Sequence, residues 1–141
     1  LVAKRSTCLR RNVGCVLVDE YNHVLSTGYN GVAAGVPHCN TYDPFAEVGY
    51  PHACAGAFAK SGTELHNCNA IHAEVNALIQ CTRPYDIDTC YTTASPCINC
   101  TRLLLNTSCK SIVFIEEYPH PESRELWISQ RRQWIHYDHI V

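Results

Sequence analysis

The chain has 141 residues, of which 46% are hydrophobic and 17% are charged. A chain of this length and composition is a globular protein with one core, and it is too short for two ordinary domains. Its formal net charge of -2 excludes the strongly basic surface of a polynucleotide-binding protein but not a mononucleotide site, and no apolar stretch approaches the roughly 20 residues of a membrane span.

The first predicted elements are the two strands of a hairpin. Residues 13–18 are apolar and rich in β-branched side chains, a polar turn follows, and residues 23–27 extend again. Gly28-Tyr29-Asn30-Gly31 then interrupts the regular pattern and is expected to be a glycine-rich turn. Gly31 and Gly35 are expected to allow positive φ or a close backbone approach. Residues 32–68 lack sustained periodicity, which in a compact domain predicts a functional or a pinned segment.

The second half of the chain alternates helices with strands. Apolar residues recur at helical spacing from His72 to Cys81. The next helix is expected to begin with Ser95 as its N-cap and Pro96 in its first turn. The remaining predicted elements are strands at 89–93 and 112–115, a helix at 122–131 and a loosely alternating strand at 134–140. This alternation predicts a single layered α/β domain over residues 1–141, with parallel later strands.

Ten cysteines and eight histidines need an explanation. Several of them are neighbours, and no signal-peptide pattern is present, so metal ligation in the reducing cytoplasm fits better than a disulfide framework. Cys15, Cys81 and Cys90 lie within apolar patterns and are expected to be small core residues. Because the chain begins with Leu1 rather than Met, we also expect that a few residues precede it.

The strongest chemical signal is His72-Ala73-Glu74 followed by Pro96-Cys97-Ile98-Asn99-Cys100. Cys97 and Cys100 are three residues apart, so in the first turn of a helix both thiols lie on one face. A helix N-terminus favours the thiolate form that zinc requires. His72 completes three protein ligands, and a catalytic zinc site leaves its fourth position to water.

Glu74 is expected to move protons rather than to bind the metal. With His72 in the first turn of its helix, both side chains reach a site beyond the helix end. Zinc lowers the pKa of its water to about 7, and a carboxylate beside that water can accept and deliver protons. The alternative is a structural Cys₂His₂ or Cys₃His site in which Glu74 is a solvated residue. The H-x-E motif, the proline before the first cysteine and the strand between them favour the catalytic interpretation.

The sequence resembles the deoxycytidylate (dCMP) deaminase family of the cytidine deaminase superfamily. H-A-E with P-C-x-x-C marks the superfamily, whose nucleobase deaminases use a glutamate that is not a ligand. G-Y-N-G, followed by Pro37-His38-Cys39, narrows the resemblance to the dCMP branch. The matching stretches are residues 13–18, 26–31, 37–39, 71–77 and 91–100.

The resemblance implies a three-layer α/β/α fold of the cytidine deaminase type with a central mixed five-stranded sheet. It implies hydrolytic deamination of dCMP to dUMP, which supplies thymidylate synthesis. It also implies a homohexamer that dCTP activates and dTTP inhibits, with Mg²⁺ accompanying the triphosphate. No polynucleotide or membrane partner is expected, and the expected location is the cytoplasm, or the host cytoplasm for a phage protein.

The resemblance also implies binding residues. Asn30 and Tyr118 are expected to contact the nucleotide, and Ala73 and Ser95 to line the base pocket through backbone groups. The effector triphosphate is expected at a subunit boundary, at the residues Gly28, Tyr29, Asn30, Gly31 and Arg83. The alternatives are ordinary: Asn30 as a left-handed turn residue, Tyr118 as a loop aromatic and Arg83 as a solvated charge at a helix end.

Some members of the family carry a second, structural zinc. Cys8, Cys39 and Cys68 match those ligand positions, and His66 or Cys54 would complete the four. A metal can order a long irregular segment, whereas the alternative is a set of buried free thiols and surface histidines.

Two kinds of rival function remain at this point. One is another zinc deaminase of the superfamily, acting on free cytidine, on a pterin- or riboflavin-type precursor, on guanine or on tRNA adenosine. The absence of a basic surface disfavours tRNA. The other is a catalytically silent zinc module that binds nucleotides, which the presence of Glu74 disfavours.

Overall fold

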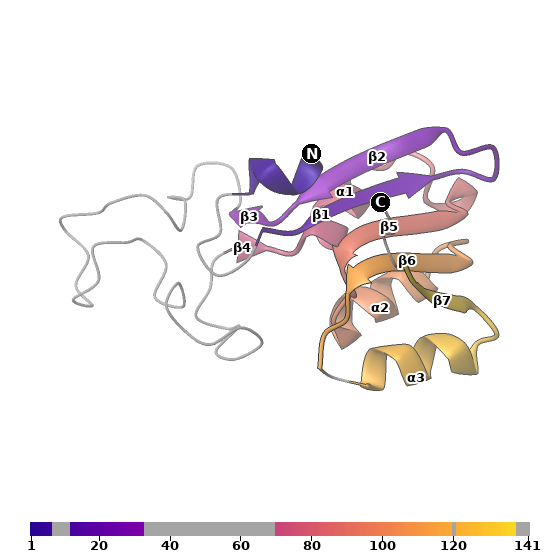
Figure 1. Ribbon diagram of the computed structural model, residues 1–141. Helices are drawn as coiled ribbons and strands as arrows, with labels where there is room; N and C mark the ends of the chain where they lie inside the picture. The colour runs from indigo at the N-terminus through magenta and orange to yellow at the C-terminus, as the bar shows by residue number, and fades with distance from the viewer. Residues whose placement is uncertain (7–11, 33–69, 120, 138–141) are drawn as a thin grey trace.

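The computed structural model describes residues 1–6, 12–32, 70–119 and 121–137 (Figure 1). Its centre is a five-stranded sheet in the order β2-β1-β5-β6-β7, which confirms the expected mixed sheet. The strands of this sheet are β1 (Gly14–Val18), β2 (Val24–Tyr29), β5 (Thr89–Ala94), β6 (Ser111–Glu116) and β7 (Gln133–His136). A separate two-stranded sheet pairs β3 (Gly31–Val32) with β4 (Ala70–Ile71).

The predicted hairpin is confirmed, because β1 pairs antiparallel with β2. The turn between the two strands is fixed by Asp19, whose Oδ1 accepts the N–H groups of Tyr21 at 2.9 Å and His23 at 2.8 Å. β1 also pairs antiparallel with β5, whereas β5, β6 and β7 are parallel to one another. The expectation of parallel later strands is therefore correct.

Three α-helices, α1 (Ala73–Gln80), α2 (Ile98–Leu105) and α3 (Glu122–Ser129), pack on one face of the sheet (Figure 1). They share a core cluster with the side chains that the strands direct to that face. Its buried members are Cys15, Leu17, Ala73, Ala77, Ile87, Cys90, Leu104, Cys109, Ile112, Phe114 and Trp127. Cys15 and Cys90 are thus core residues as expected, whereas Cys81 is only half-buried. The 3-10 helix η1 (Val2–Arg5) contacts β1 and β2.

Gly28 sets how closely α1 approaches the sheet. A Cβ atom on this residue would lie 2.3 Å from the carbonyl oxygen of Ala73 and 2.4 Å from the backbone nitrogen of Ala77. Gly28 and Tyr29 belong to β2, so the expectation of a turn is wrong for these two residues. A close backbone approach, which the sequence suggests at Gly31 and Gly35, is found at Gly28, because the strand continues under the first turns of α1. Gly35 lies outside the described residues.

The ends of the helices differ from the prediction at several residues. His72 is the N-cap of α1 and not part of its first turn, and Cys81 follows the last helical residue as C-cap. α2 begins at Ile98 with Cys97 as its N-cap, so the expectations of Ser95 as N-cap and of Pro96 in the first turn are both wrong. α3 ends at Ser129. The last strand, β7, covers residues 133–136, and residues 138–140 of the predicted strand lie outside the described part.

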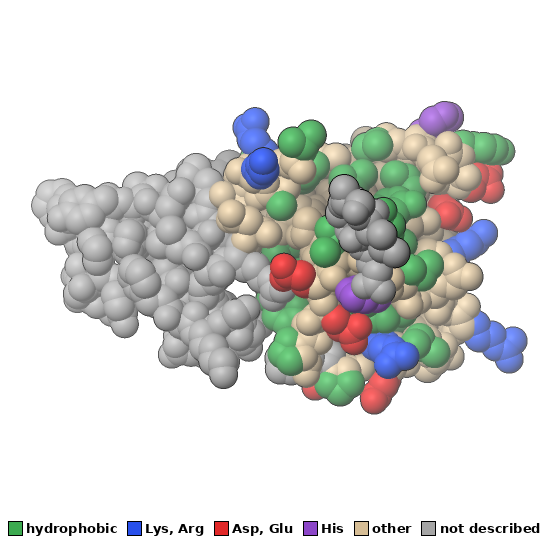
Figure 2. Space-filling model, viewed as in Figure 1, with side chains coloured by type: hydrophobic (Ala, Val, Ile, Leu, Met, Phe, Trp, Pro, Cys, Tyr) green, Lys and Arg blue, Asp and Glu red, His purple; other side chains and the backbone are tan. Residues whose placement is uncertain are grey.

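Lys and Arg side chains do not gather on the face of the molecule shown in Figure 2. Among the described residues on that face, two of these side chains lie next to each other at the upper left, and the others are separated by acidic, hydrophobic and other groups. Within the described residues, no helix combines the length and the apolar character that crossing a membrane requires.

Candidate metal and catalytic site

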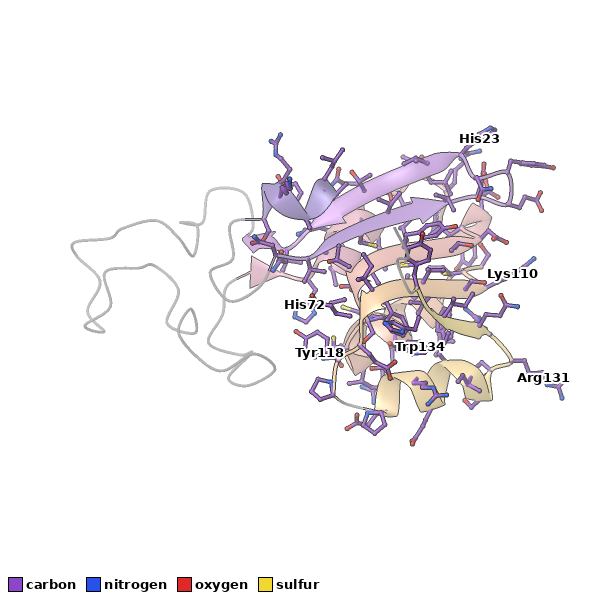
Figure 3. All side chains as sticks on the ribbon, in the orientation of Figure 1. His23, His72, Lys110, Tyr118, Arg131 and Trp134 are labelled. Carbon is purple, nitrogen blue, oxygen red and sulfur yellow. The ribbon has the colours of Figure 1, made fainter. Side chains whose placement is uncertain are left out.

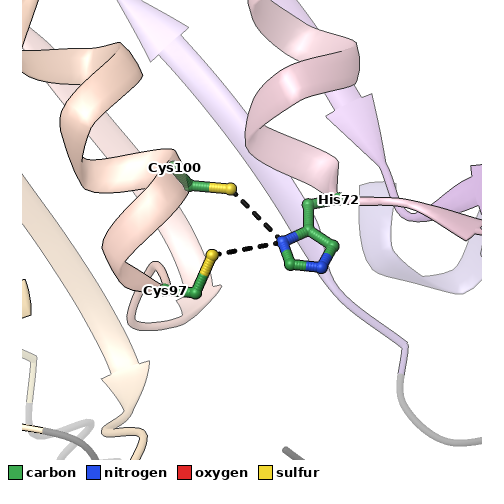
Figure 4. Close-up of side chains that lie close together, drawn as sticks. All are labelled: His72, Cys97 and Cys100. Atoms are coloured by element: carbon green, nitrogen blue, oxygen red, sulfur yellow. Dashed lines mark hydrogen bonds between the residues drawn. The ribbon is translucent and has the colours of Figure 1, made fainter. Parts of the chain in front are cut away.

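Three potential metal ligands converge where the N-termini of α1 and α2 meet (Figure 4). His72 is the N-cap of α1 and continues the extended backbone of β4, with φ -63° and ψ 149°. Cys97 is the N-cap of α2, and Cys100 lies in the first turn of that helix. The ligand atoms of the three side chains all lie within 4.8 Å of one another. The structure therefore brings together the three ligands that the sequence predicts.

The distances between these atoms fit a tetrahedral zinc site. His72 Nδ1 lies 3.3 Å from Cys100 Sγ and 3.4 Å from Cys97 Sγ. Tetrahedral zinc with ordinary bond lengths separates such donors by about 3.5–3.8 Å, so a shift of a few tenths of an ångström would accommodate the ion. Within the part of the chain that the structure describes, no fourth Cys, His, Asp or Glu joins the group. The described residues thus supply three ligands, which is the number of protein ligands that a catalytic zinc site uses.

The two thiols differ in acidity. The pKa of Cys97 is lowered to about 4, mainly by the hydrogen bond from the Cys100 thiol and also by His72. The same hydrogen bond raises the pKa of Cys100, as does its burial. Cys97 therefore provides a preformed thiolate. Cys100 must lose its proton when a metal binds, because zinc takes cysteine as the thiolate.

Glu74 lies in the first turn of α1 with only 4% of its surface exposed. Burial raises the pKa of its carboxyl group, while the nearby His72 acts in the opposite direction. The hydroxyl of Thr92 on β5 lies 3.4 Å from Glu74 Oε1. The site thus holds a buried carboxyl beside the three ligands, with its pKa shifted toward the range in which it can both accept and donate protons.

Ser95 and Tyr118 meet at the carboxyl ends of two parallel strands, β5 and β6. Ser95 is buried, and its N–H donates to the carbonyl of Glu116 at 2.8 Å. Its hydroxyl accepts the N–H of Tyr118 at 2.7 Å and so is not a helix cap. Figure 3 shows Tyr118 and His72 at the same end of the sheet, with Lys110 and Arg131 at the other end. Ligands of open α/β sheets bind at such carboxyl ends.

Asn30 and Ala73 also lie near this end. Asn30 is buried, and its Oδ1 accepts the N–H of Val13 at 2.9 Å. Among the described residues other than glycine, only Asn22 and Arg131 have positive φ, so Asn30 is not a left-handed turn residue. Ala73 is fully buried between His72 and Glu74 in sequence.

Arg83 is not brought together with Gly28–Gly31. It follows the C-terminal end of α1, whereas Gly28 packs against the first two turns of that helix. Gly28 packs at Ala73 and Ala77, in the first five residues of the helix, whereas Arg83 lies three residues beyond its last residue, Gln80. The Arg83 side chain is 59% exposed and lies 3.6 Å from Asp86, as expected for a solvated charge. The candidate ligands of a second zinc, Cys8, Cys39, Cys54, His66 and Cys68, lie outside the described residues.

Two residues around the site were not predicted from the sequence. Thr92 faces Glu74 from the neighbouring strand, and Asn76 connects α1 to the strands before it. The motif itself contains Asn76, one helical turn after His72, and this spacing is the signal that places both on one side of the helix.

Comparison with known proteins identifies a family model that covers most of the chain. The model, described as "Cytidine and deoxycytidylate deaminase zinc-binding region", matches residues 1–116. A deoxycytidylate deaminase of Schizosaccharomyces pombe is 38% identical over 125 residues, which cover 84% of this chain and 34% of that protein. This chain therefore spans about a third of the length of that relative. A deoxycytidylate deaminase of Mycobacterium phage D29 is 35% identical over 119 residues, which cover 82% of this chain and 86% of the phage protein.

The fold is also that of a solved structure. The dCMP deaminase of cyanophage S-TIM5, in complex with dCMP and dUMP, superposes with a TM-score of 0.69 and 21% sequence identity. The match covers 96% of this chain and 88% of the cyanophage chain. At that identity the likeness establishes the fold alone.

Proposed function

This chain belongs to the deoxycytidylate deaminase family of the cytidine deaminase superfamily, and from this premise we propose that it converts dCMP and water into dUMP and ammonia. The observation that carries the proposal is the group of His72, Cys97 and Cys100 with the buried Glu74 beside it. A metal site that only stabilised the fold would have no use for a buried carboxyl at this position.

The chemistry follows from the residues that surround the site. A zinc ion held by His72, Cys97 and Cys100 supplies positive charge and a water whose pKa falls to about 7. Glu74 accepts a proton from the attacking water and delivers protons to the ring nitrogen and to the departing amine. The water oxygen becomes bonded to C4 of the cytosine, and the bond from C4 to the exocyclic nitrogen breaks.

The substrate residues are proposed at the same end of the sheet. Asn30 and Tyr118 contact the sugar or base of the nucleotide, and the backbone groups of Ala73 and Ser95 line the base pocket. Supporting this, Asn30 has a fixed carboxamide and Tyr118 is held through its backbone by Ser95. Both residues can therefore be placed with little loss of conformational freedom when the nucleotide binds.

Regulation belongs to the same proposal. dCTP with Mg²⁺ activates the enzyme and dTTP inhibits it, through contacts with Gly28 to Gly31 and with Arg83. Gly28 packs against the first half of α1, whereas Arg83 lies beyond its C-terminal end, so we propose that a triphosphate touching both lies between two copies of the chain. Such an arrangement requires an oligomer, for which the hexamer is the proposed state.

A second, structural zinc is proposed at Cys8, Cys39 and Cys68, with His66 or Cys54 as the fourth ligand. The motif positions in the sequence support it, together with the number of Cys and His residues within an otherwise irregular stretch.

The proposed location of the enzyme is the cytoplasm, or the host cytoplasm for a phage protein.

A substrate screen tests the function. The zinc-loaded protein is assayed for ammonia release from dCMP, free cytidine, guanine, a riboflavin precursor and tRNA adenosine. The proposal predicts the highest kcat/KM with dCMP. Higher activity on another substrate would assign the chain to a different deamination, and binding of dCMP without turnover would identify a silent nucleotide-binding module.

A further inference from the structure

Asn76 makes two hydrogen bonds with a single side-chain atom. Its Nδ2 donates to the carbonyl oxygen of Tyr29 at 2.8 Å and faces the carbonyl oxygen of Ile71 at 3.4 Å. A carboxamide nitrogen carries two protons, so it can serve both carbonyl groups at once. One half-buried side chain on α1 therefore joins two segments that are far apart in the sequence.

The two carbonyl groups belong to the residues that precede two site residues. Tyr29 is the last residue of β2 and is followed by Asn30. Ile71 is the last residue of β4 and is followed by His72. The short β3–β4 ladder begins at the same point, where Gly31 pairs with Ile71. Asn76 thus lies where the predicted substrate residue and the metal ligand leave their strands.

The helix itself does not explain an asparagine at this position. Asparagine is several tenths of a kcal/mol less favourable than alanine within a helix, because its side chain competes for backbone hydrogen bonds. The core does not need it either, since the buried residues of α1 are Ala73, Glu74 and Ala77. What the carboxamide adds is the pair of donors directed at Tyr29 and Ile71.

We propose that Asn76 is a positioning residue that fixes Asn30 and His72 relative to each other. This proposal deepens the dCMP deaminase function and rests on it for its kinetic consequences. Its contacts are to the backbone, so it acts through the placement of Asn30 toward the nucleotide and of His72 toward the metal.

The test compares Asn76→Ala and Asn76→Asp with a control, Gln80→Glu. Gln80 is exposed one turn later on the same helix, so its variant reproduces the charge change of Asn76→Asp away from the site. Without the two donated hydrogen bonds, we expect Asn30 and His72 to shift by up to about 1 Å. Such a shift predicts a fall in kcat/KM for dCMP of about 10–100-fold in both Asn76 variants. Zinc retention against a chelator should fall by about tenfold or more in both. The melting temperature of Asn76→Ala should fall by only a few degrees, because the helix propensity of alanine offsets part of the loss of two hydrogen bonds, and both assays are therefore run well below it.

Three outcomes would overturn the proposal. One is that both Asn76 variants match Gln80→Glu in kcat/KM and in zinc retention. Another is that Asn76→Asp matches the parent protein while Asn76→Ala is impaired, because aspartate keeps the acceptor oxygen and loses the donors. The third is that the losses in kcat/KM and in zinc retention disappear when both are calculated per molecule of folded protein. If the parent protein does not deaminate dCMP, the proposed function fails, and zinc retention alone decides the role of Asn76.

Discussion

The N–H of Tyr118 donates to the hydroxyl oxygen of Ser95 at 2.7 Å, across the gap between two neighbouring strands. This bond ties the loop after β6 to the residue that directly precedes Pro96 and Cys97. The loop with the proposed substrate contact is thereby anchored to the segment that carries the metal ligands. The position of Tyr118 then depends on a side chain that is more than twenty residues away in sequence.

Ser95→Ala should raise the KM for dCMP by about tenfold with a smaller change in kcat. The variant removes the acceptor of this N–H bond, and a typical hydrogen bond contributes about 0.5–1.5 kcal/mol. Ser95→Thr keeps the hydroxyl and should retain most of the affinity. Steady-state kinetics on zinc-loaded protein measures both values.

Two comparisons separate positioning from general damage. Ser108→Ala removes another half-buried hydroxyl, which donates to Ile87 O at 2.7 Å near the start of β6, and it should leave KM unchanged. In a Tyr118→Ala background, Ser95→Ala should add little further loss, since coupled residues are not additive. Full additivity would show that Ser95 does not act through Tyr118.

The hydrogen bond between Tyr118 and Ser95 also explains why the predicted N-cap at Ser95 is wrong. From the sequence, Ser95-Pro96 is a standard helix start. The structure instead keeps Ser95 extended, paired to Glu116 through its N–H and to Tyr118 through its hydroxyl. A local pattern cannot reveal that a distant segment supplies a better partner. Similarly, the sequence suggests that Gly28 belongs to a turn, and only the packing of α1 shows that this glycine is needed within a strand.

Gly28→Ala should destabilise the fold by at least about 2 kcal/mol. The added Cβ would lie 2.3 Å from the carbonyl oxygen of Ala73, and neither backbone can move without separating α1 from β2. Urea unfolding measures the loss, with Thr27→Ala, at an exposed position of the same strand, as the control. An unfolding free energy equal to that of the parent protein would contradict the packing described for α1.

The metal site was more predictable than its surroundings. The sequence indicates His72, Cys97 and Cys100 because all three lie at helix starts. Over one helical turn, the spacing in the sequence determines which side chains lie on the same face. The contacts of Asn76 with Tyr29 and Ile71, and of Thr92 with Glu74, depend on where strands lie relative to α1. The register of those strands depends on the whole sheet. Sequence periodicity predicts that such strands exist but not which side chains face the site.

Elemental analysis should give about two zinc ions per chain in carefully purified protein. Cys39→Ala or Cys68→Ala should remove one of them and lower the melting temperature, while the ion at His72, Cys97 and Cys100 remains. Cys81→Ala is the control, because Cys81 lies at the far end of α1 from these ligands. One zinc per native chain would disprove the structural site.

dTTP should weaken dCMP binding by the same factor by which dCMP weakens dTTP binding, because allosteric coupling is reciprocal. The usual coupling of about 1–3 kcal/mol corresponds to a factor of about 5–150. Saturation by dCMP should be sigmoidal, sharper with dTTP and closer to hyperbolic with dCTP and Mg²⁺. Calorimetry and kinetics together measure the coupling. Hyperbolic kinetics without triphosphate binding would indicate an unregulated enzyme.

The most direct test of the catalytic role of the site is the turnover of dCMP by zinc-loaded Glu74→Gln. Glutamine has nearly the same shape as glutamate, so zinc content and fold should match those of the parent protein. It cannot accept the proton of the attacking water, so kcat should fall by at least about 10²–10⁴-fold. Glu125→Gln, on the exposed side of α3, should retain full activity. Near-normal formation of dUMP by the zinc-loaded Glu74→Gln variant would contradict the mechanism.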